Sequence, residues 1–227
     1  MATPVRRYSD DQAPKLRNGD CMTREEFHRA YCAMPESYRA ELIGGIVFEP
    51  SPVSYPHGES DFFIATLLGE YRAATPHVGG AQNATVMLSD EDEVQPDLFL
   101  RIERESLAHS HKTDDLYISG APELVLEIAY SSRAIDLHFK KDRYARAGVI
   151  EYIVVCLSPK TFYWFDLRAG KLLEADENGV YRSAVFPGLW IHGTGLIDLD
   201  YELTKKVLKQ GLKSPEHRKF IQELKRR

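Results

Sequence analysis

The sequence has few cysteines: its 227 residues include only Cys21, Cys32 and Cys156. Their number is odd and no close pair has the spacing of zinc ligands. This pattern excludes a disulfide scaffold and a zinc finger, and it predicts a reducing, cytoplasmic compartment. Apolar runs long enough to span a bilayer are missing, and the polar N-terminus up to Asp20 lacks a signal-peptide core. We therefore expect no membrane partner.

An excess of positive charge is also missing, because the formal net charge is -5. This balance argues against a generally basic nucleic-acid coat but is compatible with a local basic groove. Loops of the G-x-x-x-x-G-K-[ST] and G-x-G-x-x-G types are absent, so a nucleotide cofactor is not expected. Hydrophobic residues make up 43% of the chain and charged residues 28%, which is typical of a globular domain with a sizeable core.

Composition divides the chain into three parts. Residues 1–20 mix Pro, Arg, Asp and Gly without periodicity, which predicts a flexible arm. Residues 21–200 combine helical and strand patterns, and we expect one α+β domain. Residues 201–227 are helical and basic with an apolar stripe. That segment is open to three interpretations: a solvated amphipathic helix, a helix packed on a second subunit, or a cationic surface for the DNA backbone.

Caps and turns define the elements expected in the middle part. Thr23 and Glu26 form a capping box that opens a short helix, and Ser131 or Ser132 and Gly148 suit the two ends of another. In chain order, the other expected elements are a hairpin over 38–50, a helix over 56–74, strands over 81–88 and 97–102 around a solvated acidic turn at 90–93, an irregular excursion over 103–120, a strand over 122–130, a helix over 133–147, and strands over 150–157 and 161–167 followed by a meander.

Glu127 stands in the middle of an apolar strand, PELVLEIAYSS. Moving an isolated ionised carboxylate out of water costs several kcal/mol, so Glu127 must be paired, protonated, turned to solvent or bound to a cation. Simple alternation is one explanation, with Val125, Glu127 and Ala129 on a wetter face of the strand. The segment alone does not decide between these explanations.

Asp97 is a second carboxylate that could meet Glu127. It follows Pro96 at the beginning of a strand, where the missing donor of proline is tolerated. If the two strands are neighbours, their carboxylates converge at one edge of the sheet and raise each other's pKa. A divalent cation removes this repulsion, and Mg²⁺ prefers carboxylate oxygens while keeping waters for a phosphate substrate.

A lysine follows on the next helix. Leu137 and Tyr144 mark its inner face, and helical spacing places Lys140 on one side of that face and Lys141 on the other, so periodicity does not choose between them. Asp136 and Lys140 are four residues apart, which favours an ordinary surface ion pair. Asp, Glu and Lys together are nevertheless the groups used in metal-assisted phosphodiester hydrolysis.

Four segments, in this order, resemble the Uma-type "putative restriction endonuclease" family within the PD-(D/E)XK nuclease superfamily: YRAELIGGIVFEPSP, PHGESDFFIATLLGEY, VQPDLFL and GAPELVLEIAYSSRAIDLHFKKDRYARAGVIEYIVV. The similarity covers residues 39–167, with a weaker echo in FPGLWI. The resemblance implies an α+β, restriction-endonuclease-like fold, in which a mixed central β-sheet is flanked by helices. It also implies a nuclease site that uses Mg²⁺ or Mn²⁺.

By position, the resemblance assigns Asp97 as the motif's aspartate and Glu127 as its second acid. Glu41, in AELIGG, matches a family acid that joins the metal's inner or outer shell. His57, in PHGE, matches a recurrent family histidine and is a candidate accessory residue.

The lysine departs from the superfamily pattern. The standard motif places it two residues after the second acid, where this sequence has Ala129. The family resemblance instead implies a lysine on the following helix, four residues before a tyrosine. That spacing selects Lys140, with Tyr144 as a further accessory candidate.

The sequence therefore predicts a metal-dependent endonuclease acting on DNA. Asp97, Glu127 and Glu41 are the expected ligands of the ion, and Lys140 would position the attacking water or stabilise the developing charge. Cleaving both strands of a duplex needs two sites, which favours a homodimer. The alternative is a non-catalytic nucleic-acid-binding or assembly protein that retains a nuclease fold, an interpretation compatible with the displaced lysine and the negative net charge.

Overall fold

The computed structural model describes residues 16–35 and 37–226. The arm expected over residues 1–20 lies outside the described residues up to position 15. Within the described part of this segment Leu16 is packed, because its side chain is only 4% exposed and belongs to a small apolar cluster with Phe27 and Leu42, whereas residues 17–19 are exposed.

The chain alternates short strands with helices. The helices are α1 (Arg24–Cys32), α2 (Tyr55–Ala74), the π-helix η1 (Ile135–Lys140), α3 (Lys141–Ala147), α4 (Gly193–Ile197), α5 (Tyr201–Leu212) and α6 (Pro215–Lys225). The strands are β1 (Glu41–Ile43), β2 (Ile46–Phe48), β3 (Val78–Gln82), β4 (Val86–Ser89), β5 (Asp92–Val94), β6 (Leu98–Ile102), β7 (Ser110–Lys112), β8 (Ile118–Gly120), β9 (Leu124–Ala129), β10 (Glu151–Leu157), β11 (Lys160–Asp166), β12 (Lys171–Leu172), β13 (Val180–Arg182) and β14 (Trp190–His192).

Two six-stranded sheets form the body of the molecule. The central sheet has the order β12-β11-β10-β9-β6-β3, and the second has the order β2-β1-β5-β4-β8-β7. In the central sheet β9 pairs parallel with β10 and antiparallel with β6, so the sheet is mixed. Strands β13 and β14 form a separate antiparallel pair. The mixed central sheet agrees with the α+β prediction.

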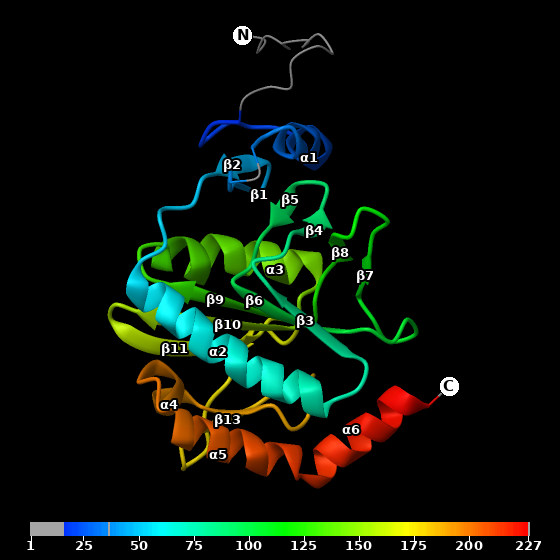
Figure 1. Ribbon diagram of the computed structural model, residues 1–227, viewed down its shortest axis with the longest axis vertical. Helices are drawn as coiled ribbons and strands as arrows, with labels where there is room; N and C mark the ends of the chain where they lie inside the picture. The colour runs from blue at the N-terminus through cyan, green and yellow to red at the C-terminus, as the bar shows by residue number, and fades with distance from the viewer. Residues whose placement is uncertain (1–15, 36, 227) are drawn as a thin grey trace.

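Helices cover both faces of the central sheet. Helix α2 crosses one face, with α5 and α6 beyond it, whereas α3 and the second sheet lie over the other face (Figure 1). Alternate residues of β9 enter the two cores: Leu124, Leu126 and Ile128 join the cluster under α2, and Val125 and Ala129 join the cluster under α3. Every residue of β9 is buried. The wetter face considered for this strand is therefore wrong.

Several local predictions are confirmed. Thr23 and Glu26 form a complete capping box at the start of α1. The Gly44-Gly45 turn joins β1 and β2, and both glycines have positive φ, 60° and 75°, which residues with a Cβ rarely adopt. Gly148 ends α3 in the left-handed conformation.

The structure differs from the predicted elements between residues 81 and 120. The single strand expected over 81–88 is divided between β3 and β4, because Asn83 has a φ of 52° and the chain passes there from the central to the second sheet. The solvated turn expected at 90–93 is wrong for Asp92 and Glu93, which lie in β5 and are 1% and 2% exposed. The expected irregular excursion contains β7 and β8.

The basic C-terminal helices pack on their own chain. Leu208 of α5 and Phe220 and Leu224 of α6 belong to the same apolar cluster as the α2 side of the central sheet. Ser214 caps α6 by accepting a hydrogen bond from the His217 N–H. Among the described residues, no helix is both long and apolar enough to cross a membrane.

Candidate active site

The pairing of β6 with β9 brings the two predicted acids together. Leu98 lies opposite Leu126, so Asp97 at the entrance of β6 comes next to Glu127. The Ile128 N–H donates to Asp97 Oδ2 at 2.6 Å, and the Asp97 N–H lies 3.5 Å from Glu127 Oε2. The two side chains thus lie at one edge of the central sheet, as the sequence predicts.

Glu127 is buried, with 4% of its surface exposed, and its Oε1 accepts two hydrogen bonds. Lys140 Nζ donates from 3.0 Å and the Tyr144 hydroxyl donates from 2.7 Å. Lys140 Nζ also lies 2.9 Å from Glu41 Oε2. One ammonium group therefore bridges two acids from different sheets, and the structure brings together all four residues expected at the site's centre.

Glu41 is held by the backbone of a neighbouring segment. It begins β1, and its Oε1 accepts a hydrogen bond from the Gln95 N–H at 2.7 Å. The tight Gly44-Gly45 turn keeps β1 and β2 in the second sheet, where β1 pairs with β5. The hairpin thus positions Glu41, which reaches the site from the second sheet.

Lys140 is positioned by an irregular helix. The segment η1 has the wider π-helical turn, which occurs frequently at functional sites, and Lys140 is its last residue. Lys140 is 8% exposed, whereas Lys141 lies over the Phe165 ring at 5.1 Å from its centroid. Periodicity could not choose between these lysines because the helix does not have a uniform 3.6-residue repeat.

The surface ion pair considered for Asp136 and Lys140 is wrong. Asp136 is 2% exposed, and its Oδ2 accepts a hydrogen bond from the Ser132 hydroxyl at 2.5 Å. The N-cap expected at Ser131 or Ser132 is not formed, because η1 begins without a side-chain cap hydrogen bond among the described residues and the Ser132 hydroxyl donates to Asp136. Asp136 is thus a buried carboxyl group on the helix that carries Lys140, and burial raises its pKa.

His57 lies at the N-terminal end of α2, and its Nε2 is 3.4 Å from Asp97 Oδ2. This contact raises the pKa of His57, while burial opposes the rise. Asp61, one turn later, is 8% exposed, and its Oδ2 accepts from Gln82 Nε2 at 2.5 Å. Burial raises the pKa of Asp61, and the charge of Asp97 adds to it.

Asp61 is the residue that sequence reasoning missed. The available signal was its spacing of four residues from His57 on a predicted helix, which places both on one face. Its Oδ1 and the Nδ1 of His57 are buried and have no hydrogen-bond partner among the described residues. These two atoms leave unused hydrogen-bonding capacity beside Asp97.

The site holds more acidic than basic side chains. Burial raises the pKa of Glu127 well above its ordinary value, and the carboxylates of Asp97, Asp136 and Glu41 add to the rise, while Lys140 opposes it. For Lys140, burial works against the charged form, but the surrounding carboxylates outweigh it and raise the pKa. The lysine therefore stays protonated, and its ammonium group interacts with the carboxyl groups of Glu127, Glu41 and Asp136.

This donor set fits a hard divalent cation. Asp97, Glu127 and Glu41 offer carboxylate oxygens, and the excess of acidic over basic groups favours an added cation. In the described part of the chain, no three His, Cys, Asp or Glu side chains form a ready-made metal cage. Mg²⁺ is usually held by one or two protein carboxylates together with waters and substrate phosphates, so two or three acids of this kind suffice.

Comparison with known proteins gives one family and one fold. The family model Uma2, described as "Putative restriction endonuclease", matches residues 24–199. The fold is similar to the crystal structure of a putative nuclease belonging to DUF820 from Anabaena variabilis ATCC 29413, with a TM-score of 0.56 and 14% sequence identity. That match covers 84% of this chain and 99% of the other. Among curated proteins, none matches. The nuclease-like α+β fold predicted from the sequence is confirmed.

Proposed function

The chain belongs to the Uma2 family, described as "Putative restriction endonuclease", and we propose that it is a metal-dependent endonuclease that hydrolyses phosphodiester bonds in DNA. One observation carries the proposal: Lys140 Nζ lies 3.0 Å from Glu127 and 2.9 Å from Glu41, at the sheet edge where Asp97 meets Glu127. Burying a lysine among several acids lowers the free energy of unfolding, because all of these groups lose contact with water. This cost favours a functional role for the cluster over a purely structural one.

Asp97 and Glu127 would hold Mg²⁺ or Mn²⁺, with Glu41 assisting. When bound, the ion supplies charge neutralisation for phosphoryl oxygens and lowers the pKa of water. Lys140 remains protonated, so its N–H groups can orient a water or donate to a phosphoryl oxygen as negative charge grows there. The Tyr144 hydroxyl fixes the orientation of Glu127 through its hydrogen bond.

His57 has a different role in this proposal. Its Nε2 faces Asp97 Oδ2, so it orients that carboxylate from the α2 side and, when protonated, offsets part of its charge. Each chain offers one such constellation, so cutting both strands of a duplex calls for a homodimer. A cytoplasmic location is part of the proposal and is supported by the three free cysteines.

Nicking of supercoiled plasmid DNA tests the activity. The wild-type protein with Mg²⁺ or Mn²⁺ should convert supercoiled plasmid to the open circle, and both Asp97→Ala and Lys140→Met should reduce the rate by at least about a hundredfold, as expected for groups that stabilise the transition state. Equal nicking by wild type and Asp97→Ala would indicate a contaminating nuclease. DNA binding without nicking by wild type would favour the non-catalytic alternative.

Metal binding is tested separately by titrating Mn²⁺ into the protein in a calorimeter. Glu127→Gln should abolish measurable binding, since it removes a charged ligand while keeping the size of the side chain. Glu59→Gln is the matched control: it removes one exposed carboxylate from α2, and within the described part of the chain this carboxylate accepts a hydrogen bond from Tyr55 of the same helix. Unchanged Mn²⁺ affinity in Glu127→Gln contradicts the assignment of this ligand.

A further inference from the structure

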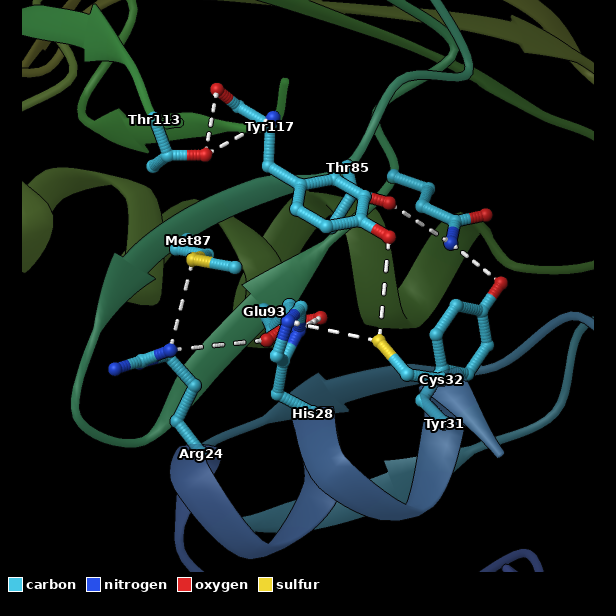
Figure 2. Close-up of polar contacts among 10 residues, drawn as sticks. Arg24, His28, Tyr31, Cys32, Thr85, Met87, Glu93, Thr113 and Tyr117 are labelled. Atoms are coloured by element: carbon cyan, nitrogen blue, oxygen red, sulfur yellow. Dashed lines mark hydrogen bonds and ion pairs between the residues drawn. The ribbon is translucent and has the colours of Figure 1, made fainter. Parts of the chain in front are cut away.

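Helix α1 presents a second cluster that the proposed nuclease chemistry does not use. Arg24, His28 and Cys32 are spaced four residues apart, so they share one face of the helix. This face lies against β4 and β5 and the segment before β8, and Figure 2 shows the three side chains directed at Met87, Glu93 and Tyr117. The cluster therefore joins a thiol, an imidazole and a buried carboxylate.

Two polar contacts connect Glu93, His28 and Cys32 in series. His28 Nδ1 lies 2.9 Å from Glu93 Oε1, and His28 Nε2 lies 3.6 Å from Cys32 Sγ (Figure 2). With Nδ1–H donating to Glu93, the Nε2 lone pair is free to accept the thiol proton. This is the arrangement of an activated nucleophile: a thiol beside a base whose orientation is fixed by a third group.

The surroundings hold the imidazole in place. Glu93 is only 2% exposed, so the orienting carboxylate is fixed in the sheet, and Arg24 Nη1 lies 3.9 Å from its second oxygen. The Tyr117 ring packs edge-on against His28, with centroids 5.2 Å apart. The Tyr117 hydroxyl is 4.0 Å from Cys32 Sγ, within reach of a developing thiolate.

The other two cysteines lack this environment. Cys156 is buried. Cys21 is exposed, and its one hydrogen-bond partner among the described residues is a backbone carbonyl, that of Gly19, at 3.9 Å from its sulfur. Cys32 combines exposure with an adjacent base. Reactive thiols are found in accessible positions next to such groups, whereas buried thiols are inert.

We propose that Cys32 is a nucleophilic thiol and a modification site for small electrophiles of the hydroperoxide class, with His28 as its base and Glu93 as a positioning residue. His28 Nε2 takes the thiol proton, and the sulfur attacks the nearer peroxide oxygen. The S–O bond forms as the O–O bond breaks. The leaving hydroxide of hydrogen peroxide, or the alkoxide of an alkyl hydroperoxide, takes the proton from His28 and departs as water or an alcohol. The sulfur is oxidised by two electrons to sulfenic acid, and the peroxide is reduced by two.

Competition between Cys32 and Cys21 within one molecule tests the proposal. The native full-length protein is treated with limiting iodoacetamide, or with hydrogen peroxide followed by dimedone, and both peptides are quantified by mass spectrometry. Cys32 should react about tenfold faster than Cys21, and the ratio should approach one in concentrated urea. A native ratio below about threefold with either reagent overturns the proposal.

Variants separate the base from general effects of helix packing. His28→Gln should bring the ratio close to one, whereas Arg29→Gln, an exposed neighbour on the same helix, should leave it unchanged. Glu93→Asp should retain more of the ratio than Glu93→Gln, because only the aspartate keeps the charge that orients His28. An unchanged ratio in His28→Gln overturns the role of the base. The readout is the thiol, so it does not depend on nuclease activity.

Discussion

The carboxylate of Glu127 accepts from Lys140 Nζ at 3.0 Å and from the Tyr144 hydroxyl at 2.7 Å, both on one oxygen. These partners offset part of the cost of burial, which leaves Glu127 with a raised pKa. The cost is not cancelled, because Lys140 is shared with Glu41 and other carboxylates lie close by. When it is ionised, Glu127 is therefore expected to lower the free energy of unfolding.

The sign of this effect gives a prediction for Glu127→Gln without divalent cations. The pKa of Glu127 is higher in the folded state than its ordinary value of 4.5. The free energy of unfolding therefore falls as the pH rises from 4.5 to the pKa of the folded state. The variant stays neutral, so it should match wild type near pH 4. Near pH 8 it should be more stable by at least about 1.4 kcal/mol, the free energy that corresponds to a tenfold difference in proton affinity.

Urea unfolding at the two pH values measures this difference, with Glu59→Gln as the control that should show no such trend. If the variant is less stable than wild type at pH 8 but as stable as wild type at pH 4, the Lys140 contact outweighs the cost of burial. The measurement thus decides which of the two opposing electrostatic effects is larger.

At the scale of elements, helix α3 is anchored to the second sheet by Arg143. Its Nε and Nη2 donate to the two oxygens of Asp92 at 2.8 and 2.6 Å, and Asp92 is 1% exposed. Asp92 Oδ1 also accepts from the Gly44 N–H of the hairpin turn at 2.8 Å. Burial would raise the pKa of Asp92, but hydrogen bonds from Arg143 and Ser89 outweigh it and lower the pKa.

This ion pair connects the helix that follows Lys140 with the hairpin that carries Glu41. Arg143→Met should lower the free energy of unfolding by about 3–5 kcal/mol, because it leaves a buried carboxylate without its cation. Arg146→Met, at an exposed position of the same helix, should change it by less than about 0.5 kcal/mol. Chemical denaturation measures both, and a loss below about 1 kcal/mol in Arg143→Met would show that this anchor contributes little.

At the scale of the whole molecule, α5 and α6 complete the core on the α2 side of the central sheet. Leu208 is 1% exposed within that cluster, while Lys206, Lys209 and Lys213 on the same helix segment are exposed. The apolar stripe is thus used within the chain, and the lysines form the outer surface. The extension predicted from composition packs as part of the fold.

Leu208→Ala should therefore destabilise the entire domain. Truncating a buried leucine leaves a cavity and costs about 2–5 kcal/mol. Lys206→Ala, on the exposed face of the same helix, should stay within about 0.5 kcal/mol of wild type. Thermal or urea unfolding of full-length protein checks this, and a Leu208→Ala protein with wild-type stability would show that α5 is an independent appendage.

The sequence by itself determined the features that depend on neighbouring residues: the capping box at Thr23, the Gly44-Gly45 turn, the apolar spacing of α2 and the apolar strand around Glu127. These local predictions succeeded because caps, turns and periodicity depend on interactions between residues that are close together in the sequence. The sequence also pointed to Asp97, and the family resemblance added Glu41 and Lys140; the roles of these three residues stay predictions.

Only the tertiary structure decided how distant segments meet. Burial of Asp92 and Glu93, the proximity of Asp61 to Asp97, and the line from Glu93 through His28 to Cys32 all depend on strands brought together across dozens of residues. In the sequence, the acidic run from Asp90 to Glu93 resembles a solvated turn. In the structure, Arg143 and His28 from other elements bind its buried carboxylates. Charge burial is a property of the assembled neighbours, and local sequence does not contain them.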